Sequence, residues 1–144
     1  MTTTLTFSFK NQLAEIERLG KVLTAFAQQQ GWSSQFLFET NIALEELFTN
    51  IISYGYEEEQ EHDIVLRLSD ATQELTIEME DDGRPFNLLE TPNPDVTLSL
   101  EEREVGGLGI YFVRQFMTDV TYQRTEGKNR IMLKKKHEAQ TGKE

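Results

Sequence analysis

The 144-residue sequence contains no cysteine, which excludes disulfide bonds and cysteine-based metal sites. No apolar run in it approaches the roughly 18 to 20 residues that a membrane-spanning helix needs. The stretch from Met1 to Leu5 lacks the basic start and the apolar segment of a secretory signal peptide. These absences predict a cytoplasmic protein that does not associate with membranes.

Basic residues are also scarce, with 14 lysines and arginines against 25 acidic side chains and a formal net charge of −11. Non-specific nucleic-acid binding needs a basic footprint, so nucleic acid is not an expected partner. An acidic surface suits solubility or a partner with a basic surface. The length and the 38% hydrophobic content fit a single globular domain, which we place at residues 1–137 with a polar tail at 138–144.

Apolar periodicity predicts the secondary structure. Expected strands lie near residues 5–9, 64–68, 75–79, 119–124 and 130–136. Expected helices run from a cap at Asn11 to Gly31, from Ser33 or Ser34 to about Gly55, and from about Gly107 to Met117. This order predicts an α/β (α+β) two-layer sandwich, whose mixed, mostly antiparallel sheet is covered on one face by helices.

Periodicity fails between Asp82 and Glu104, where Pro85, Pro92 and Pro94 interrupt the sequence. A loop of roughly 20 residues is long for a compact domain, and such loops are often functional lids. We therefore expect residues 82–104 to form a lid beside a ligand site.

The second expected helix carries a carboxylate and an amide four residues apart, Glu46 and Asn50, which places them on one face. The Asn50 carbonyl could ligate Mg²⁺, and Glu46 could act as a general base. Glu45 points about 100° away around the helix and should face elsewhere. The alternative is an ordinary solvated helix surface.

Two glycine motifs follow. Asp81 and Gly83 come at the end of an expected strand, where a carboxylate could accept a hydrogen bond from a ligand amine or simply cap the turn. Residues 106–109 (GGLG) open the last expected helix, whose N-terminal N–H groups suit a phosphate. Alone, this glycine cluster could be a flexible entry to a packed helix.

Taken in order, these segments resemble the Bergerat-fold (GHKL) ATP-binding family, and within it the anti-sigma-factor serine/threonine kinase branch. The N box resembles residues 41–56 (NIALEELFTNIISYGY), the first glycine box residues 80–87 (EDDGRPFN), and the second residues 106–114 (GGLGIYFVR). The resemblance spans about residues 7–135. It implies that Glu46 is the catalytic base, that Asn50 coordinates Mg²⁺ at the ATP phosphates, and that Asp81 accepts from the adenine amino group.

The resemblance also implies that Gly83 lets the base approach and that residues 107–109 (Gly107, Leu108 and Gly109) present backbone N–H groups to the phosphates. The family often has a threonine in its final hairpin near the adenine; here Asn129 is the polar stand-in. The lid can supply a basic side chain to the γ-phosphate, a place close to Arg103. Arg103 is surrounded by glutamates, so it could equally belong to an exposed charge cluster.

The implied function is that of an ATP- and Mg²⁺-dependent serine/threonine protein kinase that phosphorylates a small anti-sigma-factor antagonist and regulates a sigma factor. Members of this branch are often homodimers. The alternative is a nucleotide-gated regulator that binds a partner without significant kinase activity. A two-component kinase module is disfavoured, because no dimerising helical hairpin with an acceptor histidine is visible and His62 and His137 are interpreted as exposed loop histidines. A plain α/β interaction domain remains the fourth interpretation.

Overall fold

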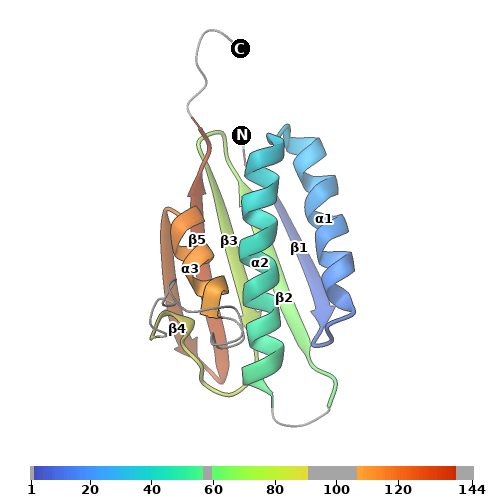
Figure 1. Cartoon of the computed structure of the whole chain (residues 1–144). Helices are drawn as coiled ribbons and strands as arrows, with labels where there is room; N and C mark the ends of the chain where they lie inside the picture. Colours follow the sequence, from blue (N-terminus) through green and yellow to red (C-terminus); the bar gives the residue numbers. More distant parts are fainter. Residues whose placement is uncertain (1, 57–59, 91–106, 139–144) are drawn as a thin grey trace, which may run out of the picture.

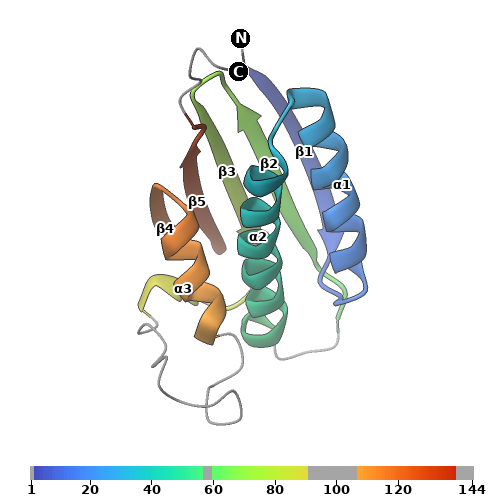
Figure 2. The ribbon, with the colours of Figure 1, turned by 45° about the horizontal axis from the view of Figure 1, so that its top comes forward.

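The computed structural model describes residues 2–56, 60–90 and 107–138. In these ranges, helices cover one face of a five-stranded sheet, as Figures 1 and 2 show. The elements are β1 (Thr3–Lys10), α1 (Glu15–Gln30), α2 (Ser34–Gly55), β2 (Asp63–Asp70), β3 (Glu74–Asp81), the short 3₁₀ helix η1 (Leu88–Glu90), α3 (Gly107–Phe116), β4 (Asp119–Thr125) and β5 (Lys128–Lys136). The predicted two-layer sandwich and the predicted order of elements are confirmed.

The sheet has the strand order β1-β2-β3-β5-β4, and all four ladders are antiparallel. We expected a mixed sheet, and the difference has a simple cause. Two consecutive helices join β1 to β2, so the chain returns in the opposite direction. The strands β3 and β4 run the same way, but β5 lies between them and pairs antiparallel with both.

The core lies between the helices and the covered face of the sheet. Alternate strand residues point inward, and they are completely or almost completely buried; among them are Phe9, Ile64, Leu66, Ile77 and Leu133. The opposite face is polar, as expected for an antiparallel sheet with one face in water. On that face Glu80 forms ion pairs with Arg67, Lys128 and Arg130.

The helix ends follow the sequence signals except at α1. Gly31 ends α1 in the left-handed conformation, with φ of 72°, and Ser33 caps α2 by accepting a hydrogen bond from Phe36 N. The prediction that Asn11 caps α1 is wrong: the N-cap is Ala14, which provides no side-chain bond. The Asn11 side chain instead contacts the segment before β2, since His62 N donates to its Oδ1 over 2.8 Å.

The final hairpin is tighter than expected. Its turn consists of Glu126 and Gly127, both with positive φ, which suits a two-residue turn between twisted strands. We expected the turn to extend to Asn129, whereas β5 already begins at Lys128. Asn129 therefore lies inside the sheet, directly opposite Asp81 of β3.

The end of the sheet where β2 and β5 finish is closed by a buried carboxylate, Asp70. It accepts hydrogen bonds from Trp32 Nε1 over 2.9 Å and lies 2.6 Å from His137 Nε2. The His137 ring also stacks on Phe36, with ring centroids 4.3 Å apart. The interpretation of His137 as an exposed loop residue is therefore wrong.

The expected lid and the expected polar tail lie mostly outside the residues that the structure describes. Most of the expected lid, residues 91–104, and the last six residues of the expected tail, 139–144, lie outside the described residues. Within the described ranges, every helix is too short or too polar to cross a membrane.

Candidate functional site

Four segments that carry predicted site residues meet at one end of the molecule. The helix α2 and the strand β3 finish there, and α3 and β5 begin there. The antiparallel pairing of β3 with β5 places Asp81 opposite Asn129 at this end. At the other end, Lys135 of β5 contacts the backbone carbonyl of Phe116, the last residue of α3.

Asp81 is buried, and both donors that reach its carboxyl group from the described residues bond the same oxygen. Burial raises the pKa of Asp81, although hydrogen bonds from Asn129 and from the Gly83 amide act against this effect. Oδ1 accepts from Gly83 N over 2.9 Å and from Asn129 Nδ2 over 3.0 Å. In the described part of the chain, no group donates to Oδ2, so this oxygen could serve a ligand.

Asn129 is buried beside Asp81, and its amide is fully engaged with the protein. Besides Asp81, its Nδ2 donates to the backbone carbonyl of Arg84 over 2.9 Å, and its Oδ1 accepts from the Tyr122 hydroxyl. These contacts orient Asp81. They make Asn129 a residue that positions the carboxylate.

Gly83 allows the turn after β3 to lie directly on the end of α2. A Cβ atom at this position would be only 2.5 Å from the carbonyl oxygen of Gly55. The next amide, Arg84 N, donates to that same carbonyl over 2.8 Å. The turn is therefore fixed against the helix backbone, and this contact explains the glycine without any ligand.

Glu46 and Asn50 lie on one stripe of α2, as predicted from their spacing. Glu39, seven residues before Glu46, belongs to the same stripe and bonds Lys135 of β5 over 2.7 Å, so the stripe faces the α3 side of the sheet. Asn50 is buried, and its Nδ2 donates to the carbonyl of Glu46 over 2.7 Å. This bond leaves Oδ1 as the outward group of the amide.

The carboxyl group of Glu46 has a raised pKa. Partial burial is the main cause, and the charge of the neighbouring Glu45 adds to it. Glu45 itself bonds elsewhere, because its Oε2 accepts from Asn41 Nδ2 over 3.1 Å. A carboxylate with a raised pKa is a stronger base, which is the property that a proton acceptor needs.

The backbone of residues 107–109 forms the first turn of α3, so the first N–H groups of this helix open toward the same end as Asp81. Ile110 and Val113 are buried and anchor the helix on the core. Arg114 donates to the carbonyl of Leu89 over 2.6 Å and ties η1 to α3. Gly106 and the predicted phosphate contact Arg103 lie outside the described residues.

Sequence reasoning missed the residues that hold the turn from the outside. Arg124 Nη1 donates to the carbonyl of Gly83 over 2.7 Å, and Tyr56 Oη donates to Asp82 Oδ1 over 2.9 Å. His62 Nδ1 lies 3.2 Å from Asp82 Oδ2; His62 is in a loop, as expected, but it is half-buried where we expected it to be exposed. Arg124 could have been found from the hairpin register, which pairs it with Asn129; the contacts of Asp82 leave no local signal.

Residues 9–135 match the family described as histidine kinase-like ATPase domain. The serine-protein kinase RsbW of Listeria monocytogenes is 27% identical over 141 residues, which cover 95% of this chain and 88% of RsbW. The serine/threonine-protein kinase BtrW of Bordetella bronchiseptica is 27% identical over 111 residues, 77% of this chain and 78% of BtrW. An anti-sigma F factor of Clostridium perfringens is 28% identical over 115 residues, 79% of this chain and 82% of the factor.

Among solved structures, the histidine kinase domain of a blue-light activated histidine kinase from Erythrobacter litoralis has a similar fold. The TM-score is 0.52 with 14% sequence identity, and the match covers 85% of this chain and 59% of that chain. At this identity the likeness concerns the fold alone.

Proposed function

The chain belongs to the histidine kinase-like ATPase family, and from this membership we propose that it is an ATP-dependent serine/threonine protein kinase of the anti-sigma-factor type. The observation that carries the proposal is the meeting of three groups at one end of the fold: the buried Asp81 carboxyl, the Glu46–Asn50 stripe, and the first turn of α3. The names of the relatives RsbW, BtrW and anti-sigma F factor support the same activity class.

The buried carboxyl is suited to an adenine amino group. Its Oδ1 is already satisfied by Gly83 N and Asn129 Nδ2, so the carboxylate is oriented before a ligand arrives. We propose that Oδ2 accepts from the adenine amine, and that the tight Gly83 turn leaves room for the base.

The phosphates would lie between α2 and the start of α3. The backbone N–H groups of residues 107–109 are at a helix N-terminus, which attracts anions through unpaired donors and the helix dipole. The donor set fits Mg²⁺ as well, since Asn50 offers a hard carbonyl oxygen and Mg²⁺ is usually held by few protein ligands together with substrate phosphates. When bound, the ion would neutralise charge on the phosphates.

Glu46 would serve as the proton acceptor for transfer. The hydroxyl oxygen of a protein serine or threonine forms a bond to the γ-phosphorus, the bond to the β–γ bridging oxygen breaks, and ADP leaves with that electron pair. The hydroxyl proton passes to the Glu46 carboxylate. Phosphoryl transfer depends mainly on the positioning of the reactants and on stabilisation of their charge. One side chain that accepts the proton, held on a rigid helix, is therefore sufficient for the reaction.

The proposed substrate is a small anti-sigma-factor antagonist protein, and the proposed regulated partner is a sigma factor. We further propose that Arg103 contacts the γ-phosphate and that the chain acts as a homodimer. A direct test incubates the purified protein with labelled ATP, Mg²⁺ and candidate antagonists encoded near its gene. Nucleotide binding without transfer to any antagonist would contradict kinase activity.

A nucleotide-gated regulator without significant transfer is the second candidate. The proposed contacts of Asp81 and Asn50 to the nucleotide do not involve the Glu46 carboxylate, so binding and transfer can be separated. Glu46→Gln should abolish transfer and keep nucleotide affinity if the protein is a kinase. If partner regulation survives Glu46→Gln unchanged but is lost in Asp81→Asn, the second candidate is favoured.

A further inference from the structure

Asp82 follows the proposed adenine acceptor directly but contacts a different part of the molecule. It lines an open hollow together with Glu61, His62, Asp63, Val65, Glu80, Asp81 and Lys128. Its side chain is 47% exposed, so burial alone does not fix it. Hydrogen bonds hold it in place.

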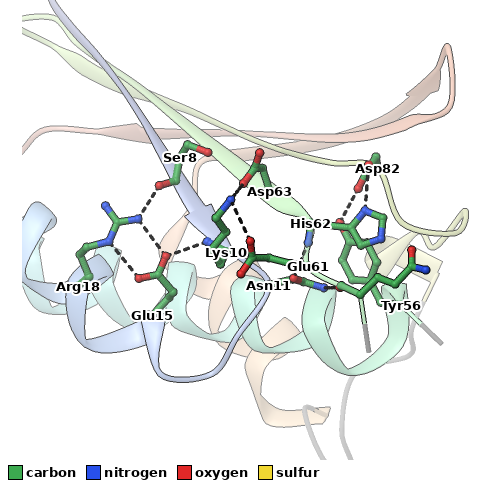
Figure 3. A network of polar contacts seen from close by, with 11 residues as sticks. Ser8, Lys10, Asn11, Glu15, Arg18, Tyr56, Glu61, His62, Asp63 and Asp82 are labelled. Atoms are coloured by element: carbon green, nitrogen blue, oxygen red, sulfur yellow. Dashed lines mark hydrogen bonds and ion pairs between the residues drawn. The ribbon is translucent and has the colours of Figure 1, made fainter. Parts of the chain in front are cut away.

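Two aromatic side chains bind the Asp82 carboxylate, as Figure 3 shows. Tyr56, directly after α2, donates to Oδ1 over 2.9 Å, and His62 lies 3.2 Å from Oδ2. The two rings stack on each other with centroids 4.7 Å apart. Burial of Asp82 works against its charge, but these two bonds outweigh that effect and lower the pKa of Asp82.

His62 is itself held by the loop that follows β1. Asn11 N donates to the carbonyl of His62 over 3.0 Å, and His62 N donates back to Asn11 Oδ1 over 2.8 Å. Asn11 Nδ2 also donates to the carbonyl of Gln60 over 3.2 Å. A chain of contacts therefore runs from the β1–α1 loop through His62 to Asp82, as Figure 3 shows.

We propose that Tyr56 and His62 are positioning residues for the nucleotide, which act through Asp82 on the turn that carries Asp81 and Gly83. The inference rests on the proposed function. The turn is fixed on its inner side by the Gly55 carbonyl and by Asn129, and the Asp82 contacts fix it on the outer side. Asp82 lies between Asp81 and Gly83 in the chain, so a backbone shift at Asp82 would displace the Gly83 amide that donates to Asp81 Oδ1.

The experiment measures the dissociation constant of Mg²⁺-ADP by calorimetry. Tyr56→Phe, which removes only the hydroxyl, should weaken binding about three- to tenfold, because part of the free energy of a hydrogen bond to a charged group is lost. Asp63→Asn is the matched control: this carboxylate is similarly exposed, pairs with Lys10 and does not contact Asp82, so its affinity should equal that of the wild type.

The second contact is tested by His62→Gln. This change removes the imidazole that lies 3.2 Å from Asp82 Oδ2, and it should weaken ADP binding about two- to fivefold, part of the free energy of one hydrogen bond to a charged group. The control is His137→Gln, which changes the other histidine of the chain at the opposite end of β2 and should keep the wild-type affinity.

Hydrogen exchange in the nucleotide-free protein tests the contact independently of binding. The amides of Gly83 and Arg84 should exchange faster in Tyr56→Phe than in the wild type. If the wild type binds ADP while Tyr56→Phe and His62→Gln bind it equally well, with unchanged hydrogen exchange, the inference is overturned. If the wild type and Asp63→Asn both fail to bind ADP, the proposed function itself fails, and the inference falls with it.

Discussion

Asn129 Nδ2 donates a hydrogen bond to Asp81 Oδ1 over 3.0 Å, between two buried side chains 48 residues apart in the sequence. The same amide reaches the Arg84 carbonyl, so one side chain joins β5 to the end of β3 and to the turn beyond it. The proposed adenine site is therefore held together by the last hairpin of the chain.

Asn129→Ala should weaken both stability and nucleotide binding. The change leaves the Arg84 carbonyl and the Tyr122 hydroxyl without this partner and removes one of the two donors to Asp81 Oδ1. Loss of a hydrogen-bond partner costs about 1–3 kcal/mol at a buried group and less at a half-buried one, so we expect the free energy of unfolding to fall by about 1–3 kcal/mol in all. Urea denaturation measures the first effect and ADP calorimetry the second; a stable variant with wild-type affinity would contradict the orienting role.

The elements with strong local signals could be predicted from the sequence. Gly31 and Ser33 marked a helix end and a helix start, and alternating apolar residues marked the strands, because these signals act within a few residues. The spacing of Glu46 and Asn50 placed them on one face for the same reason. Strand direction was harder, since it depends on β5 lying between β3 and β4.

Contacts across the fold could not be predicted. Asn11 has the chemistry of a helix cap, yet its amide bonds a segment about 50 residues later, because tertiary partners compete with the local one. No local pattern predicts that His62 contacts Asp82 or that His137 contacts Asp70, because only the fold brings these pairs together. Because the turn of the last hairpin consists only of Glu126 and Gly127, Asn129 lies inside β5 and not in the turn.

Gly83→Ala and Gly20→Ala should have opposite effects on stability. A Cβ at residue 83 would meet the Gly55 carbonyl oxygen at 2.5 Å, a backbone atom that cannot move aside without shifting α2. We expect a loss of about 1–3 kcal/mol, typical of overpacking, together with weaker ADP binding. At residue 20, inside α1, the nearest atom lies at 3.8 Å, so the higher helix propensity of alanine should stabilise the protein by up to about 1 kcal/mol. Thermal denaturation of both variants checks the two signs, and a stable Gly83→Ala protein would refute the close contact.

The pH dependence of transfer should report on Glu46. Its pKa is raised by burial and by the charge of Glu45, and the base must be ionised, so the rate should fall on acidification at a higher pH than for an ordinary glutamate. Glu45→Gln removes the like charge and lowers the pKa of Glu46. The fall of the rate on acidification, which is the acid limb of the pH–rate profile, should therefore move to lower pH. Glu17→Gln, an exposed carboxylate on α1, removes the same charge elsewhere and should leave the limb in place. Identical limbs in the wild type and Glu45→Gln would argue against Glu46 as the base.

The same raised pKa predicts that the proposed base reduces stability. The folded state holds its proton more tightly than the unfolded state, so stability should decline as the pH rises from the ordinary value of glutamate through the raised value in the fold. Glu46→Gln removes this penalty. The variant should be more stable than the wild type at neutral pH, and the difference should vanish at a pH below the ordinary glutamate range. Urea denaturation at both pH values tests this, and a difference that grows on acidification would have the wrong sign.

Asp70→Ala should lower stability without affecting the nucleotide site. Asp70 is buried and holds Trp32 Nε1 and His137 Nε2, so its loss leaves an indole donor and an imidazole unpaired, at about 1–3 kcal/mol each. Trp32 is the single tryptophan, and its fluorescence should therefore report the change directly. The proposed nucleotide site lies at the opposite end of β3. This strand has eight residues, so the site is roughly 25 Å from Asp70. Under conditions where the variant is folded, ADP affinity should equal that of the wild type, in contrast to Asn129→Ala with a similar loss of stability. If both variants lost affinity in proportion to stability, binding would depend on global stability, and the local role of Asn129 would be refuted.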